Sequence, residues 1–304
     1  MTGKLFIDGL DAYTQYGVSL AKGAYEVIVC HPPLKDVEVN EWHEYDGIEA
    51  DLSSPKLDSR TLSIPFVCND WYETGAMYEL LADGAFHTFL FTELALTLSL
   101  RLVAQNSVKT LKWLQMFTLN FADDFPLNGF VYSEPIESDF IDGYVLDEKD
   151  FGSFGIRVQN GTLEEVYRLP AVKENKLVNI KSNDGVIYDG QAVKFKAKDV
   201  KLSLLMRSVD IGTFWKNYNA FLFMLVLPNE RNLYVSDTEE SFACYYKESE
   251  VTEMHILSNG RIWCKFSVTL VFTSFRLGTF DILLAEQQGG LITDQSSENF
   301  INLG

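Results

Sequence analysis

The tetrapeptide Phe6-Ile7-Asp8-Gly9 returns letter for letter as Phe140-Ile141-Asp142-Gly143. One short match can arise by chance, so the residues that follow each copy decide whether the chain contains a repeat. A shift of 138 residues carries Gly17 onto Gly155 and Asp46-Gly47 onto Asp184-Gly185. Larger shifts, of 140 and 151 residues, align two further segments: Leu62-Ser63-Ile64 with Leu202-Ser203-Leu204, and Phe117, Leu119 and Phe121 with Val268, Leu270 and Phe272. The sequence therefore predicts one domain that is written twice.

The length of the chain agrees with this interpretation. Its 304 residues correspond to two domains of the usual size, roughly 100–200 residues each. Residues 133–150 are rich in acidic side chains and mark the boundary. We therefore expect a first domain over residues 1–137, a second over 138–285, and a polar C-terminal tail over 286–304.

The composition favours pleated strands. Hydrophobic residues make up 47% of the chain and aromatic residues 13%, with 22 Phe and 14 Tyr, which excludes a disordered chain and favours β-structure. The predicted fold is mainly β, a β-sandwich or split barrel with one short helix per domain, in two tandem copies.

Local patterns place the expected elements. Leucines alternate with small or polar residues over residues 94–102, a period of two that predicts a strand. Asp70 and Asp210 each precede a helical pattern and are expected to cap it. Asp-Gly pairs predict hairpins at Asp46-Gly47 and Asn183-Asp184-Gly185. The other expected strands cover residues 4–7, 25–30, 60–68, 116–121, 155–158, 200–206, 223–227 and 265–272.

The charge limits the partners. The chain carries 43 acidic and 25 basic residues, a net charge of −18, so its field repels nucleic acid and anionic membranes. DNA could pass such a surface without being gripped, but specific DNA binding is not expected.

We expect a protein made in the cytoplasm without a signal peptide or membrane insertion. The first residues lack the apolar core of a leader. The longest strongly apolar run, residues 220–227, is far short of the roughly 20 residues that cross a bilayer.

No pattern predicts a catalytic, cofactor-binding or metal site, so we expect neither an enzyme nor a cofactor. The histidines lack the i, i+4 spacing of a helical zinc pair, and the usual hydrolase and nucleotide motifs do not occur. Cys30 and His31 with His43 form the one group that resembles metal ligands, and ordinary loop residues explain it better. The four cysteines do not match between the halves and are expected to be buried free thiols.

The tryptophans raise the question of sugar stacking. Trp71 and Trp215 fall in the two predicted helices, where packing explains them more simply. Trp42, beside His43 in the acidic loop, is the candidate for an exposed contact.

The order of these motifs resembles the N-terminal ring-forming domain of phage distal tail proteins and, more broadly, the tail-tube and hub superfamily. The resemblance covers nearly all of both halves and rests on these segments: Phe6-Ile7-Asp8-Gly9, Tyr16-Gly17-Val18, Leu62 to Phe66 before Asp70, Phe140-Ile141-Asp142-Gly143, Phe154-Gly155-Ile156 and Glu230-Arg231-Asn232-Leu233-Tyr234. The chain departs from the usual distal tail layout, because a second ring-type domain stands where an accessory carbohydrate-binding-like domain often sits.

The resemblance implies a structural component of a phage or prophage-derived tail. Such a protein forms a ring that joins the tail tube to the host-recognition apparatus, performs no catalysis, and lets DNA pass through without binding it specifically. Its partners would be copies of itself, as a trimer or hexamer, and other tail proteins, and its location the virion tail. Assembly through sheet edges and acidic loops is the expected contact. The alternatives are a β-sandwich glycan-binding or adhesin protein and, less favoured, a hydrolase with a pocket between the halves.

Overall fold

The computed structural model describes most of the chain. The described residues are 2–68, 71–111, 114–127, 132–136, 138, 140–174, 177–178, 181, 184–185, 187–188 and 193–274. The expected polar tail and the capping residue Asp70 lie outside them.

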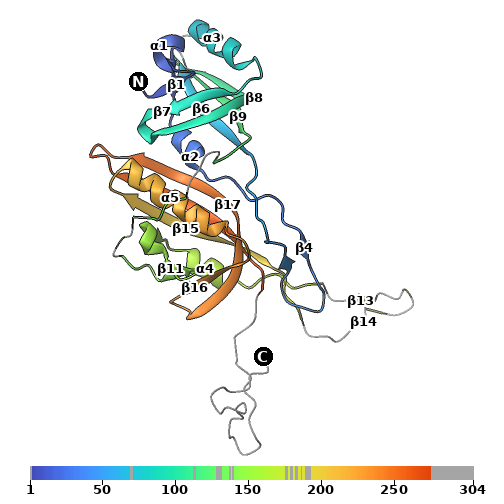
Figure 1. Ribbon diagram of the computed structural model, residues 1–304. Helices are drawn as coiled ribbons and strands as arrows, with labels where there is room; N and C mark the ends of the chain where they lie inside the picture. Colours follow the sequence, from blue (N-terminus) through green and yellow to red (C-terminus); the bar gives the residue numbers. More distant parts are fainter. Residues whose placement is uncertain are drawn as a thin grey trace, which may run out of the picture.

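The first unit contains nine strands and four helices within the described residues, here called β1–β9 with α1–α3 and η1 (Figure 1). In chain order they are β1 (Leu5–Ile7), β2 (Leu10–Asp11), α1 (Ala12–Tyr16), β3 (Val18–Leu20), α2 (Ala24–Val29), β4 (Val39–Asn40), β5 (Glu49–Ala50), β6 (Arg60–Cys68), α3 (Trp71–Leu81), β7 (His87–Phe91), η1 (Thr92–Leu94), β8 (Leu96–Leu111) and β9 (Leu114–Asp123).

The second unit repeats the order of the strands, with a longer helix α5 in the place of α3 and no counterpart of η1 among the described residues. Its elements are β10 (Tyr144–Leu146), β11 (Lys149–Asp150), η2 (Phe151–Phe154), β12 (Ile156–Val158), α4 (Thr162–Tyr167), β13 (Leu177–Val178), β14 (Ile187–Tyr188), β15 (Lys198–Ser208), α5 (Ile211–Leu225), β16 (Arg231–Val235), β17 (Glu240–Ile256) and β18 (Ile262–Phe272).

The two units have the same sheet topology. The first sheet runs β2-β1-β7-β8-β9-β6-β3 and the second β11-β10-β16-β17-β18-β15-β12, with every printed pair antiparallel. In each sheet one long strand, β8 or β17, pairs with a short strand at its start and with a long strand over the rest of its length. The fold is mainly β, in two tandem copies of one domain, as the sequence predicts.

Backbone hydrogen bonds also repeat at a shift of 138 residues. The amide of Lys35 donates to the carbonyl of Lys56 at 2.8 Å, and that of Lys173 to Lys194 at 2.7 Å. The hairpins predicted around Asp46-Gly47 and Asp184-Gly185 are present as β4–β5 and β13–β14.

The tetrapeptide match, however, does not mark equivalent positions. The structural counterpart of Phe6-Ile7-Asp8-Gly9 is Val145-Leu146-Asp147-Glu148, because each segment ends a strand in two residues with positive φ. Asp8 bonds both backbone groups of Thr88 on β7, and Asp147 does the same with Asn232 on β16. The prediction was wrong about these residues, although the repeat itself is present.

Two further alignments are displaced by two residues. Val18 pairs with Cys68 and Ile156 with Met206, so β6 and β15 correspond at a shift of 138 rather than 140. In a strand a slip of two residues keeps every side chain on its own face, which is why the predicted faces are right although the pairing is not. The final strands likewise correspond as Phe117 to Phe266 rather than to Val268.

Two segments expected to be strands are helical. Residues 24–29 form α2, and residues 223–225 continue α5 instead of starting a strand. Helix α5 buries Ala220, Phe221, Leu222, Met224 and Leu225, so its end is apolar on nearly every side. An apolar run of this length does not distinguish a buried helix from a buried strand.

Phenylalanines form the core of both units. Phe89 on β7 meets Phe121 on β9 edge to face at 4.9 Å, and Phe151 meets Phe221 in the same manner at 5.1 Å. All four cysteines are free thiols, and Cys68, Cys244 and Cys264 are buried, as predicted, whereas Cys30 is half-buried. Within the described residues, no helix combines the length and apolar character that crossing a membrane requires.

Candidate functional site

The candidate site lies where α2 of the first unit meets β17 and α5 of the second (Figure 1). The end of α2 is fixed by Arg60, whose guanidinium donates to the carbonyls of Ile28 (3.3 Å) and Cys30. Arg60 also donates through Nε to a carboxylate oxygen of Asp123 at 2.8 Å, and both side chains are nearly buried. A cation at a helix C-terminus satisfies carbonyls that have no partner within the helix.

His31 follows α2, and its side chain packs against the second unit. Its ring stacks on Tyr218 of α5, with centroids 3.7 Å apart and planes 20° from parallel. Neither ring nitrogen of His31 has a hydrogen-bond partner among the described residues. Burial, and to a lesser degree the nearby Arg60, lowers its pKa well below the ordinary value, so the ring is neutral near pH 7.

Strand β17 supplies the polar contacts of the junction. The thiol of Cys30 donates to the Ser249 carbonyl at 3.1 Å, and the amide of His31 donates to the Ser249 hydroxyl at 3.2 Å. The Tyr246 hydroxyl donates to the carbonyl of Pro32 at 2.8 Å. The amide of Leu34 donates to the Lys247 carbonyl at 2.8 Å. These bonds attach residues 30–34 to the part of the β17 edge that does not pair with β16.

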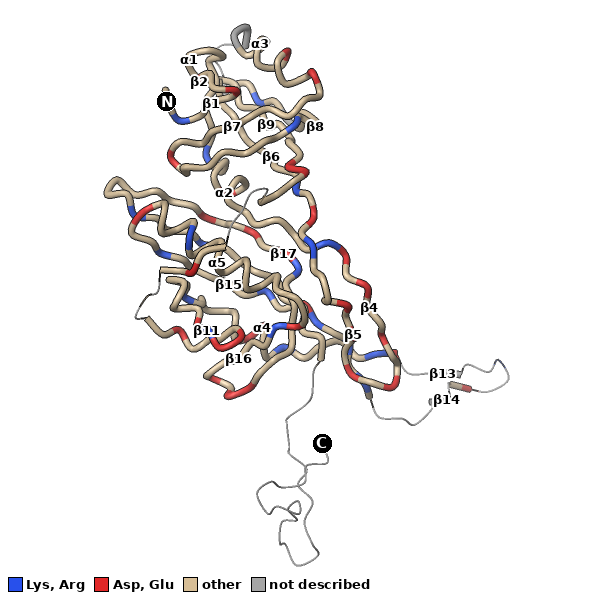
Figure 2. Tube along the Cα trace, in the orientation of Figure 1, with Lys and Arg blue, Asp and Glu red and all other residues tan. Residues whose placement is uncertain are grey.

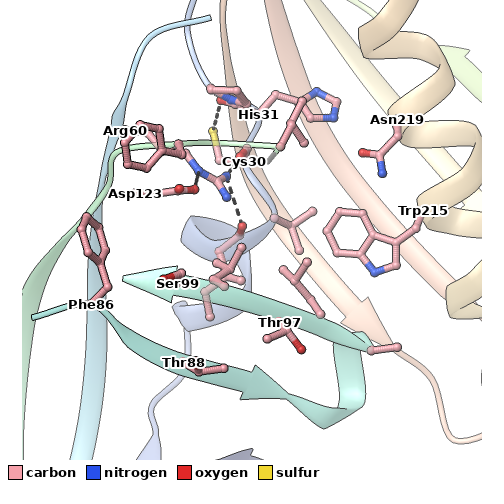
Figure 3. A pocket seen from close by; sticks show the side chains of 18 residues that line it. Cys30, His31, Arg60, Phe86, Thr88, Thr97, Ser99, Asp123, Trp215 and Asn219 are labelled. Atoms are coloured by element: carbon pink, nitrogen blue, oxygen red, sulfur yellow. Dashed lines mark hydrogen bonds and ion pairs between the residues drawn. The ribbon is translucent and has the colours of Figure 1, made fainter. Parts of the chain in front are cut away.

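A cavity of about 660 Å³ opens beside the junction (Figure 3). Arg60 with Asp123 lies on one side, and Trp215 and Asn219 project from α5 on the other. The indole N–H of Trp215 donates to the carbonyl of Leu94 at 2.6 Å, so Trp215 links the units, as the packing interpretation of this residue predicts.

A second contact clamps the β4–β5 hairpin to the second unit. The amide of Phe195 donates to Asp46 and that of Gly47 to the Phe195 carbonyl, each at 2.8 Å. Lys173 is buried and its ammonium donates to the carbonyls of Trp42 (2.8 Å) and Gly47 (2.7 Å). The acidic loop expected to contact other chains therefore holds the two units of its own chain together.

The residues singled out from the sequence are divided between two places. Cys30 and His31 meet at the junction, whereas His43 is exposed in the β4–β5 turn. Trp42 is 52% exposed, and its indole N–H donates to Glu49 at 3.2 Å. The side chain of Trp71 lies outside the described residues. Within those residues, no group of three His, Cys, Asp or Glu side chains is arranged to hold a metal ion.

The junction is arranged for packing rather than for proton transfer. Burial raises the pKa of the Cys30 thiol, which keeps it protonated and poorly nucleophilic, and the His31 ring stacks on Tyr218 instead of meeting the thiol. Arg60, Asp123, Lys173 and Ser249 were not predicted as site residues. Their partners are distant in the sequence, and no local pattern signals them.

No family model matches the chain, and no curated protein matches its sequence. A structure search finds a resemblance to the Dit protein of SPP1, described as a paradigm of hub adsorption apparatus in Gram-positive infecting phages, at 11% identity. The match covers 88% of this chain and 98% of that one with a TM-score of 0.30.

Proposed function

We propose that the chain is a structural component of a phage or prophage-derived tail, at the distal tail or baseplate hub, and that it acts by assembling into a ring rather than by catalysis. In this proposal residues 1–137 and 138–285 are the two ring-forming domains and residues 286–304 a polar tail. The ring would join the tail tube to the host-recognition apparatus.

The observation that carries the proposal is that one chain builds the same seven-stranded sheet twice and joins the two units by hydrogen bonds. A closed ring repeats one heterologous contact around an axis. A chain that already makes such a contact between its own two units needs fewer copies to close the same circle, so three chains would supply six units.

The charge of the chain supports a conduit. Acidic residues are distributed over both units and along the β4–β5 hairpin (Figure 2), and the net charge is −18. A negative wall repels the DNA phosphates and lets the duplex pass without being held.

The test is the shape of the assembled protein. We expect mass photometry of the full chain, alone and mixed with a tube protein from the same particle, to show a discrete trimer or hexamer, and negative-stain images to show a central hole. A monomer under all of these conditions would contradict the proposal.

Glycan binding is the second candidate, because aromatic side chains are exposed on the β4–β5 hairpin. Trp42 is 52% exposed and Tyr45 70%. A duplicated lectin would carry such a platform in both units, but the corresponding residues of the second are Ile180 and Asn183. A glycan array distinguishes the candidates: binding that Trp42→Ala abolishes would favour the lectin.

A further inference from the structure

The segment that ends α2 and follows it, residues 29–34, is here called the first corner. Its counterpart at the end of α4, residues 167–172, is the second corner, and the two differ in the part of the structure that packs against them. The helices before both corners begin with a left-handed glycine, Gly23 and Gly161. Both corners also end in the same isolated bridge, between Leu34 and Leu57 and between Val172 and Phe195. The two corners therefore have the same backbone.

The side chains of the first corner are buried against the second unit. Val29 is 1% exposed and His31 4%, and the amide of Leu34 donates to β17. The corresponding side chains of the second corner, Tyr167 and Leu169, are 54% and 58% exposed.

One backbone group of the second corner also differs from its counterpart in the first. Val172, the counterpart of Leu34, is 49% exposed, and its amide donates to no described residue. Large apolar side chains beside a free amide at the surface of a soluble domain indicate an interaction site.

The receiving strand has a counterpart as well. Val251 on β17, which lies beside α2, is 8% exposed. The register of the two sheets places Val108 of β8 at the same position, since Val108 pairs with Phe117 and Val251 with Phe266. Val108 is 47% exposed.

The edge of the receiving strand is also repeated. Lys247, whose carbonyl accepts the Leu34 amide, lies at a bulge of β17, and Val103 lies at the matching bulge of β8. Strand β7 pairs with β8 only as far as Leu100. Beyond Leu100, one edge of the described part of β8 has no neighbouring strand. The equivalent edge of β17 is the one to which Leu34 is bonded.

We propose that the corner after α4 of one chain docks on β8 of a second copy of this chain, in the arrangement that the corner after α2 adopts on β17 within each chain. Leu169 takes the place of His31 against Tyr78 of α3, the counterpart of Tyr218. The Val172 amide donates to the Val103 carbonyl. The inference rests on the proposed function, because it names the contact through which the copies assemble.

This contact is heterologous, so each chain has one donor face and one acceptor face at opposite ends of the repeat. The donor face consists of Tyr167, Leu169 and Val172, and the acceptor face of Val103 and Val108. A chain that lacks either face cannot grow an assembly by itself, but two chains that lack different faces still share one intact contact.

The experiment uses the full chain with Leu169→Glu, which places a charge on the donor face, and Val108→Glu, which does so on the acceptor face. Val209→Glu is the matched control, because Val209 is 65% exposed and belongs to neither face. Circular dichroism first establishes that each variant is folded, and sedimentation then gives its size.

We expect each of the two face variants to self-associate at least tenfold more weakly than the wild type, and an equimolar mixture of the two to form a one-to-one dimer. The control variant should assemble as the wild type does. If both face variants assemble normally, or if their mixture stays monomeric, the inference is wrong while ring assembly through another surface remains. A wild-type chain that is always monomeric overturns the inference and the proposed function together.

Discussion

In the first unit the turn at Asp46-Gly47 is bonded to Phe195 of the second unit, whereas in the second unit a Cβ built on Gly185 would meet no described residue within 4 Å. The corners after α2 and α4 differ in the same sense. The sheets are alike, so the difference lies in the neighbour. The two copies of the domain keep the same core, whereas the surface residues of each copy depend on the part of the protein that packs against it.

The largest effect that separates the two copies is expected at these turns. Both glycines have positive φ, +73° at Gly47 and +81° at Gly185, but a Cβ at Gly47 would lie 1.7 Å from the Thr273 carbonyl oxygen while one at Gly185 meets nothing within 4 Å. We expect Gly47→Ala to lower the unfolding free energy by about 2–4 kcal/mol, from strain and overlap, and Gly185→Ala by about 1 kcal/mol. Urea denaturation measures both values. Equal losses would show that the first turn is not held against the second unit.

The next effect concerns His31, which stands where the second unit has Leu169. Burial, with Arg60 nearby, lowers its pKa, so below about pH 6.5 the unfolded chain binds a proton that the folded chain does not. Stability should therefore fall with decreasing pH, by up to about 1.4 kcal/mol per pH unit from this group.

The variant His31→Leu, which copies Leu169, should remove this part of the acid sensitivity. The measurement is the unfolding free energy between pH 5 and pH 7.5, with His43→Leu as the control because His43 is exposed. Identical slopes for the wild type and His31→Leu would contradict the buried stack on Tyr218.

The smallest effect concerns one bond that the two copies make with different cations. Asp8 binds His87 at 2.7 Å, and Asp147 binds Arg231 at 2.8 Å. Burial opposes the charged form of His87, but the hydrogen bonds that its ring donates to the carboxylates of Asp8 and Asp83 outweigh burial and raise its pKa. The stability gained from this pair is complete below about pH 6.5 and is lost as the pH rises through the raised pKa.

We expect His87→Arg, which copies the second unit, to remove the loss of stability between pH 6 and pH 9 that deprotonation of His87 causes. Thermal melts over that range, with the exposed His255→Arg as control, give the comparison. An unchanged pH profile in His87→Arg would mean that the Asp8 pair contributes little.

The periodic parts of the fold could be predicted from the sequence. The strand over residues 60–68, the helix after residue 70 and both hairpins appear where alternation, capping and Asp-Gly pairs place them. The repeat could be detected too, but not its register: the exact tetrapeptide match misled because the fold preserves the turn carboxylate, Asp8 and Asp147, and not the residues around it.

The junction could not be predicted, for a physical reason. Its contacts join residues that are distant in the sequence, such as Cys30 with Ser249 and Tyr246 with Pro32, and neither side has a local pattern that requires the other. The sequence analysis considered Cys30 and His31 as possible metal ligands and did not predict that they pack against the second unit. The packing of α2 on β17 places both residues between the two units.

The unequal lengths of β16 and β17 have one more consequence. Strand β17 extends past β16, and there the carbonyls of Lys247 and Ser249 accept from the Leu34 amide and the Cys30 thiol. A link between peptide groups tolerates almost any side chain at either position. Attachment of this kind allows the side chains on both segments to change while the distance between the two units stays the same.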